Sequence, residues 1–177
     1  MDNNYTDIKL LYGASMGVGT AYELLKRDKI TIDKIWFDGG GIASNATLLP
    51  KMLSPVLIKK HRALEKNPGK GVPNLVRQFG ESFAEIRKRN FIKLTEQDIR
   101  NICGEYTHRK LVNLPEPVQK RIHFDYGSKD MNLKGARKEI PRYFANSSLT
   151  VRNGYGHCGY MAFHTEEYVK ELEAFMQ

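Results

Sequence analysis

Three residues carry side chains that could together perform nucleophilic catalysis. Ser15 lies at the centre of the pentapeptide GASMG (residues 13–17), and Asp130 and His157 follow later in the chain. A serine hydroxyl becomes a nucleophile when a histidine accepts its proton and a carboxylate orients that histidine. If the fold brings these three side chains together, they could perform acyl transfer through a covalent serine intermediate.

The pentapeptide is a G-x-S-x-G motif, and its surroundings favour a strand, a tight turn and a helix. Residues 8–12 form a short, mostly apolar run, and apolar side chains recur at helical spacing from Val18 onward. A serine on such a turn has a strained backbone, and its hydroxyl stands clear of the sheet. We expect Gly13 and Gly17 to be needed because side chains there would collide, and the N–H of Met16 to face a developing oxyanion. The glycine spacing does not fit a dinucleotide fingerprint.

Alternating strand and helix patterns at both ends of the chain predict a parallel sheet. Besides residues 8–12, strand-like runs occur at residues 34–37, 122–126 and 148–151. Helical patterns cover residues 132–144 and 165–176, the latter with Val169, Leu172 and Phe175 on one face. This order is typical of an α/β fold with right-handed crossovers.

The central segment, residues 42–120, has helical periodicity only and is predicted to be an all-helical insertion. Thr95 followed by Asp98 indicates a capped helix start. The chain has a net charge of +8, and this segment holds all of the excess, with 15 Lys and Arg against 7 Asp and Glu. A solvated helical surface explains this charge, as does an anionic substrate, membrane surface or partner that faces the segment. We expect His61 and His108 in this segment to be solvated.

Taken together, the motifs resemble the C-terminal part of the α/β-hydrolase family. The G-x-S-x-G turn follows the first predicted strand, Asp130 ends the G-x-x-D sequence GSKD after the third, and His157 follows the fourth. The resemblance implies a partial α/β-hydrolase fold of about four parallel strands flanked by helices. Residues 1–41 and 121–177 would form the hydrolase core, and residues 42–120 a helical cap.

What the resemblance implies about activity is a serine hydrolase that acts on an ester, thioester or amide bond of a small-molecule acyl substrate. Ser15, Asp130 and His157 would be the catalytic triad, with Met16 as an oxyanion donor and Gly13 and Gly17 as the glycines of the nucleophile turn. No cofactor and no metal would be needed. The alternative is a truncated, catalytically silent remnant or a self-associating interaction module.

Other polar residues compete for these roles or accompany them. Asp125, in the strand before Asp130, is the rival for the acid. His123 is expected to be packed or surface-facing, and His164 to have a capping or surface role. Asp38 could lie near Ser15 as a supporting polar group, and the glycines at residues 39–41 are interpreted as a hinge into the insertion.

The family resemblance also implies N-terminal strands that precede residue 8. Without them, the strand from Ile8 to Tyr12 would be an unpaired apolar edge, which invites pairing with another chain. We therefore expect either a homo-oligomer through this edge or a separate N-terminal segment that completes the sheet. That segment would also carry the second oxyanion donor.

Several classes of protein are not favoured by the composition. No apolar run reaches the roughly 18 residues that a membrane helix needs. The basic clusters are short and lack interleaved aromatic residues, so nucleic acid is not an expected partner. The N-terminus does not resemble a signal peptide, and Cys103 and Cys158 make no disulfide framework, which favours a cytoplasmic protein.

Overall fold

The computed structural model describes residues 7–27, 29–42, 48–69, 71–108 and 110–177. The chain divides into two compact units. Residues Met1–Ile42 and Leu111–Gln177 form the first, which we call the sheet unit, and residues Ala43–Lys110 form the second, the helical unit. Each unit is described by itself.

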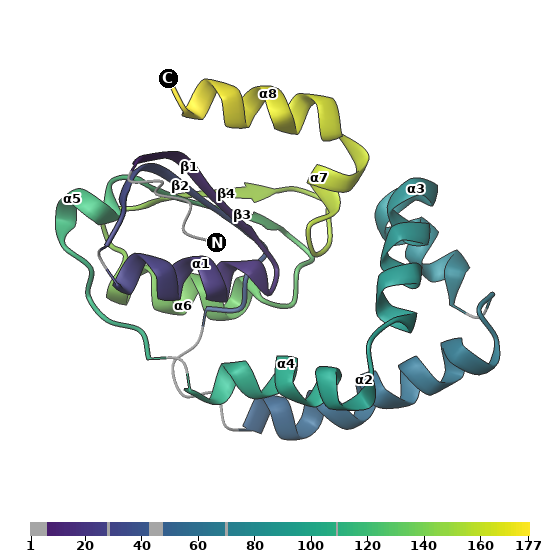
Figure 1. The fold of residues 1–177 in the computed structure, drawn as a ribbon. Coiled ribbons are helices and arrows are strands. Elements are labelled where there is room, and N and C mark those ends of the chain that lie inside the picture. The colour runs from purple at the N-terminus through teal and green to yellow at the C-terminus, as the bar shows by residue number, and fades with distance from the viewer. Residues whose placement is uncertain (1–6, 28, 43–47, 70, 109) are drawn as a thin grey trace. The chain divides into compact units, whose positions relative to one another are not determined.

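The sheet unit is built on four parallel strands in the order β1-β2-β3-β4. These strands are β1 (Asp7–Ala14), β2 (Thr31–Asp38), β3 (Ile122–Gly127) and β4 (Ser148–Arg152). Helices α1 (Gly17–Lys26) and α6 (Leu133–Tyr143) cover one face, and α8 (Thr165–Phe175) covers the other (Figure 1). Two short helices, α5 (Glu116–Gln119) and α7 (Gly159–Phe163), precede β3 and α8. The predicted parallel α/β sheet is therefore confirmed.

The core lies between the two central strands and the helices that cover them. Side chains of β3 are buried along its whole length, and Ile35 of β2 and Phe124 of β3 are fully enclosed. Leu111 and Leu114 pack into the same core, so the chain returns to the sheet unit at Leu111. Residues 111–120, which are predicted to belong to the insertion, thus lie in the sheet unit, because their leucines bury apolar surface in its core.

The final helix packs through part of the face that the sequence pattern predicts. Phe175 packs, with its ring centroid 5.2 Å from that of Trp36, and Leu172 is half-buried. Val169, also predicted on this face, is instead 44% exposed, whereas Tyr168 is 2% exposed. The buried face therefore includes Tyr168 in place of Val169, and it brings a tyrosine hydroxyl against the sheet.

The helical unit consists of α2 (Leu48–Lys66), α3 (Val72–Ile92) and α4 (Glu96–His108). Helix α3 is broken at Gly80, whose backbone has φ 71°. The predicted start of α4 is confirmed, since the Asp98 N–H donates to the Thr95 hydroxyl at 3.1 Å and Asp98 accepts the Thr95 N–H at 2.8 Å. His61 is 2% exposed, so the expectation that it is solvated is wrong. The side chain of His108 lies outside the described residues.

Within the described residues, no helix is both long and apolar enough to cross a lipid bilayer.

Candidate active site

Ser15 occupies a strained turn between β1 and α1. Its φ is 53°, a left-handed conformation that is uncommon for residues other than glycine. The backbone N–H of Ser15 donates to the carbonyl oxygen of Asp38, at the end of β2, at 2.7 Å. This bond fixes the turn to the carboxyl edge of the sheet, where parallel α/β folds place their ligands.

The two motif glycines do not have equal roles. A Cβ atom on Gly13 would lie 2.9 Å from the Gly17 carbonyl oxygen and 3.0 Å from the backbone of Val18, too close for any side chain. A Cβ atom on Gly17 would have nothing within 4 Å. The expected collision at Gly17 is therefore wrong, because that residue begins α1 on its exposed side.

His157 lies between Ser15 and Asp130. Its Nε2 is 2.8 Å from the Ser15 hydroxyl oxygen, and its Nδ1 is 2.9 Å from Asp130 Oδ2. A carboxylate only accepts hydrogen bonds, so Nδ1 carries the proton and Nε2 is left to accept the serine proton. The Asp130 side chain is completely buried, and its other oxygen accepts the Asn132 N–H at 2.8 Å.

The turn after β2 touches the acid–histidine pair directly. Gly39 has φ 63°, and a Cβ atom there would lie 3.1 Å from both Asp130 Oδ2 and His157 Nδ1. The side-chain amide of Asn132 donates to the Gly39 carbonyl at 2.9 Å and so ties this turn to the acid loop. Asn132 was not singled out in the sequence, because a contact across 93 residues leaves no local pattern.

Met16 is the residue that precedes α1, and its side chain is 48% exposed. Backbone N–H groups of a first helical turn have no acceptor within the helix and point toward its N-terminal end. Met16 stands at the N-terminal end of α1, where such groups gather. Its role as an oxyanion donor stays a prediction.

Asp125, the alternative candidate for the acid, binds Arg152 and not His157. Its carboxylate accepts hydrogen bonds from Arg152 Nη2 at 2.7 Å and from Arg152 Nε at 2.9 Å. Arg152 also pairs with Glu171 of α8. Because desolvation dominates, burial raises the pKa of Asp125, while Arg152 holds it down. The structure thus places Asp130, and not Asp125, on His157.

The other two histidines of the sheet unit lie outside this constellation. His164 is paired with the hydroxyl of Tyr155. His123 Nδ1 is 2.7 Å from the hydroxyl of Ser148, its partner in the β3–β4 register, while its Nε2 is buried without a hydrogen bond among the described residues. Burial lowers the pKa of His123 to about 4, and the charge of Arg152 adds to this.

Asp38, whose main-chain carbonyl accepts the Ser15 N–H, also carries a buried carboxyl group. It is 3% exposed and accepts a hydrogen bond from the Tyr168 hydroxyl at 3.0 Å. Burial raises the pKa of Asp38 to about 6, and the negative charge of Asp125 raises it further, whereas the Tyr168 hydrogen bond and His157 oppose the rise. Burial also raises the pKa of Tyr12 and of Tyr168 well above the ordinary tyrosine value.

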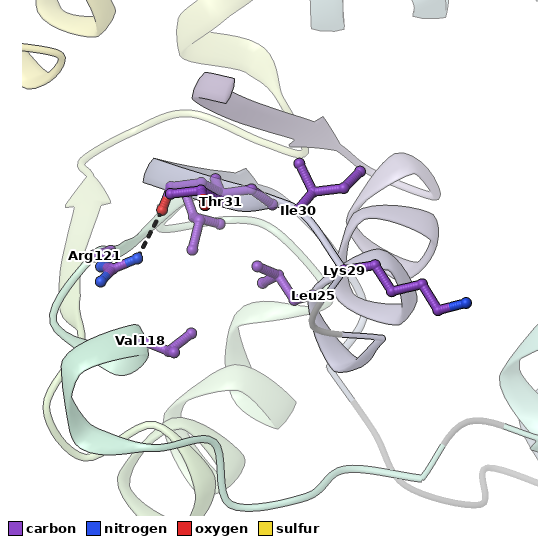
Figure 2. Close-up of a pocket in the computed structure, with 8 residues that line it drawn as sticks. Leu25, Lys29, Ile30, Thr31, Val118 and Arg121 are labelled. Atoms are coloured by element: carbon purple, nitrogen blue, oxygen red, sulfur yellow. Dashed lines mark hydrogen bonds between the residues drawn. The ribbon is translucent and has the colours of Figure 1, made fainter. Parts of the chain in front are cut away.

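A hollow of about 450 Å³ lies at the opposite end of the sheet (Figure 2). It is lined by Leu25, Lys29, Ile30, Thr31, Ile32, Ile35, Val118 and Arg121. The Lys29 side chain points away from it, and Arg121 Nη1 donates to the Ile32 carbonyl at 3.0 Å. This hollow contains no nucleophile–base pair.

Within the residues described, no three His, Cys, Asp or Glu side chains are arranged to hold a metal ion. Cys103 and Cys158 are both buried, and neither takes part in a disulfide bond.

Comparison with solved structures identifies the fold. The chain superimposes on a bromoperoxidase from Bacillus anthracis with a TM-score of 0.67 at 17% identity, covering 94% of this chain and 66% of that one. An esterase from Exiguobacterium antarcticum gives a TM-score of 0.67 at 16% identity, with the same coverage of 94% and 66%. An α/β-hydrolase family protein from Desulfitobacterium hafniense gives 0.63 at 13% identity, covering 98% and 71%. No protein-family model and no curated protein sequence matches the chain.

These comparisons define the class of fold. The chain has a partial α/β-hydrolase fold, with four parallel strands flanked by helices and a helical segment inserted after β2. It spans about two thirds of the length of the first structures that it matches, 66% in two of the three above.

Proposed function

We propose that this chain is a serine hydrolase that cleaves ester, thioester or amide bonds of a small acyl substrate. The observation that carries the proposal is the continuous hydrogen-bonded series Ser15–His157–Asp130, with separations of 2.8 and 2.9 Å. The strained turn at Ser15 supports it, because stored backbone strain is concentrated at functional positions.

In this mechanism, His157 Nε2 takes the hydroxyl proton of Ser15 as the serine oxygen attacks the substrate carbonyl. Asp130 holds the Nδ1 proton and stabilises the imidazolium that forms. The imidazolium then donates its proton to the leaving group, and the acyl group stays on Ser15. Water attacks the acyl-enzyme with His157 again as the base, which releases the acid and restores the serine.

The negative charge on the substrate oxygen needs hydrogen-bond donors. The Met16 N–H supplies one in our proposal. Loss of a single donor commonly lowers the rate by about 10²–10³-fold, so a second donor matters. We propose that it comes from a strand segment added at β1.

The open edge of β1 is the place for such an addition. β1 lies at the end of the strand order, and no described residue pairs with its outer side. An unpaired strand edge readily accepts another strand. We propose that a second copy of the chain, or an N-terminal segment, pairs there. Sedimentation velocity across a range of concentrations tests this pairing. A chain that is monomeric and unpaired at β1, and that hydrolyses esters as fast as the paired form, would contradict the proposal.

The helical unit is a candidate for substrate selection. Its excess of cations favours an acidic or otherwise polar substrate, and we propose this as the role of its positive charge. This preference is measured by comparing the hydrolysis rates of neutral and carboxylate-bearing esters of the same acyl length. Equal rates for the two would contradict the proposal.

The hydrolase proposal is tested with p-nitrophenyl acetate and the full chain. A burst of p-nitrophenol equal to the enzyme concentration is expected, followed by slower turnover, because acylation precedes deacylation. Ser15→Ala should abolish both phases. Ser148→Ala is the matched control, since Ser148 also bonds a histidine but lies at the start of a strand. Folded wild-type protein without a burst or turnover would favour the silent or self-associating alternative.

A further inference from the structure

Helix α2 carries a positively charged outer face. Its sequence contains five lysine and arginine residues but one acidic residue, Glu65. Arg62 is paired with Glu96 of α4. The other four cations are exposed and form no ion pair with a described residue. They are Lys51, Lys59, Lys60 and Lys66. The charge of these lysines is therefore available to a partner from outside the helical unit.

The inner face of the same helix is already occupied. Ile58 and His61 are buried, and Leu57 packs with Ile58 in a cluster that includes Ile99 and Cys103 of α4. Figure 1 shows α4 lying along α2. An amphipathic helix buries one face and presents the other outward. The lysines of α2 therefore lie on the face that the described residues of the helical unit leave uncovered.

This outer face also presents apolar side chains. Met52 is 73% exposed and Val56 is 49% exposed. Met52, Val56 and Lys59 follow one another at spacings of four and three residues, which places them on one side of the helix. At 3.6 residues per turn, Lys51 and Lys60 lie on either side of this stripe. Apolar side chains among unpaired cations fit a partner with negative charge at its surface and hydrocarbon beneath.

The length of the charged face indicates an extended partner. Lys51 and Lys66 are 15 positions apart, which corresponds to about 22 Å along a helix axis. A small acyl substrate would contact only part of such a face. A nucleic-acid surface would need exposed aromatic side chains for base stacking, and α2 contains no Phe, Tyr or Trp. An anionic lipid surface is long enough, and it also accounts for the exposed Met52 and Val56.

We propose that the outer face of α2 binds the surface of a bilayer that contains anionic lipids. The lysines contact the negatively charged headgroups, and Met52 and Val56 enter the boundary between headgroups and acyl chains. Lysine suits this place because its alkyl stem lies along hydrocarbon while its ammonium group stays in water. The helix lies on the bilayer and does not cross it. This inference goes beyond the proposed hydrolase function and does not rest on it.

Vesicle co-sedimentation with the full chain tests this binding. The probes are vesicles of phosphatidylcholine alone and of phosphatidylcholine with about 30% phosphatidylserine. We expect binding to the mixed vesicles and little binding to the neutral ones. Raising the salt from about 0.1 M to about 0.5 M should release most of the bound protein, because salt screens exposed charges. Equal binding to both kinds of vesicle, or no binding to either, overturns the proposal.

Two variants separate the charged part of the face from its apolar part. Lys59→Glu/Lys60→Glu should weaken binding to the mixed vesicles by about tenfold or more, because two attractive charges become repulsive. Met52→Gln keeps the charge but removes an inserting side chain, so binding should fall roughly three- to tenfold. Binding at the wild-type level in either variant overturns the assignment to this face.

The matched control makes the same change of charge on α6. Lys134 and Arg137 are exposed there, but α6 has no large exposed apolar side chain. Lys134→Glu/Arg137→Glu should bind within about twofold of wild type, because charges more than about 10 Å from the lipid are largely screened at 0.1 M salt. A loss equal to that of Lys59→Glu/Lys60→Glu would show that net charge alone drives binding, and would overturn the proposal.

Fluorescence reports whether the apolar side chains insert. In Met52→Trp, the emission should shift to the blue when mixed vesicles are added, since the new side chain enters an apolar environment. The tryptophan already present, Trp36, is 4% exposed, so wild type serves as the blank. Emission that stays unshifted while the protein binds polyglutamate would assign the face to an acidic polypeptide and overturn the lipid proposal.

Discussion

The sheet unit contains two serine–histidine pairs, one at each end of its strands. Ser15 and His157 meet at the carboxyl end, with their atoms 2.8 Å apart, and Ser148 and His123 meet near the start of β3 and β4, 2.7 Å apart. The distances are nearly equal. A serine–histidine hydrogen bond is therefore not what distinguishes a reactive site.

Three features separate the two pairs. His157 has a carboxylate on its second nitrogen, whereas the second nitrogen of His123 is buried without a partner among the described residues. Ser15 lies on a strained turn, whereas Ser148 begins an ordinary strand. Burial holds the pKa of His123 near 4, so it stays neutral and cannot readily accept a proton at pH 7.

The largest expected difference between the pairs is in catalysis. His157→Ala should lower kcat/KM for p-nitrophenyl acetate by about 10⁴-fold, because the base and its orientation are lost together. His123→Gln should stay within roughly threefold of wild type, since that histidine serves packing. Steady-state kinetics on both folded variants measure this, and similar losses in the two would remove the distinction.

The carboxylate is the next feature to test. Asp130→Asn leaves the shape intact but presents an amide to His157 Nδ1, which favours the wrong tautomer. We expect kcat to fall by about 10³–10⁴-fold. Asp125→Asn is unsuitable as a control because it would unpair Arg152. If Asp130→Asn retained wild-type kcat, the third member of the series would be dispensable.

The strained turn is tested by a matched pair of glycine substitutions. Gly13→Ala should destabilise the protein by about 1–3 kcal/mol and displace Ser15, because its Cβ would press against backbone atoms at 2.9–3.0 Å. Gly17→Ala should be neutral or slightly stabilising, since its Cβ meets nothing within 4 Å and alanine favours helices. Urea unfolding and kcat/KM on both variants provide the comparison. Equal losses of stability and of kcat/KM in the two variants would show that the turn differs from the one described.

A smaller effect is expected from the pH dependence of His123. Its pKa is lowered from about 6.5 to about 4 in the folded protein, so the unfolded chain binds the proton more readily between these values. The stability associated with neutral His123 is present above about pH 6.5 and is lost as the pH falls toward 4. Between pH 7 and 4.5, wild type should lose about 2 kcal/mol more than His123→Gln. Parallel pH dependences for the two proteins would contradict the burial of a neutral histidine.

The smallest effect should come from the hollow at the amino end of β2. Arg121→Ala removes one hydrogen bond, to the Ile32 carbonyl, from an exposed side chain. We expect a change in unfolding free energy of about 1 kcal/mol or less and kcat/KM within twofold of wild type. A large loss of activity would mean that the hollow, and not only the carboxyl edge, participates in the reaction.

The sequence predicted the features that depend on local pattern. The strand–turn–helix around Ser15, the parallel strand order and the capped start of α4 follow from periodicity and from residue chemistry over a few positions. Asp130 and His157 could be named because their places after the third and fourth strands resemble those of the acid and the histidine in the α/β-hydrolase family. What the sequence did not reveal depends on contacts between distant residues. The Tyr168–Asp38 bond spans 130 residues, and the hydrophobic pattern of α8 pointed to Val169 instead.

The predicted collision of a side chain at Gly17 was wrong for a similar reason, because it depends on three-dimensional geometry. A motif lists two glycines, but only the geometry of the turn decides which one faces the backbone. At Gly13 the chain folds back onto the start of α1, and at Gly17 it faces solvent. Likewise, Leu111 and Leu114 lie in the sheet unit because of their packing, which no local pattern in residues 111–120 indicated.

The most direct test of the central claim is labelling with a fluorescent fluorophosphonate, followed by mass-spectrometric mapping of the modified peptide. A serine reacts with this probe only when a base activates it. We expect modification of Ser15 in wild type, no modification in Ser15→Ala or His157→Ala, and normal modification in Ser148→Ala. Modification at another serine, labelling that survives His157→Ala, or an unlabelled but folded wild type would contradict it.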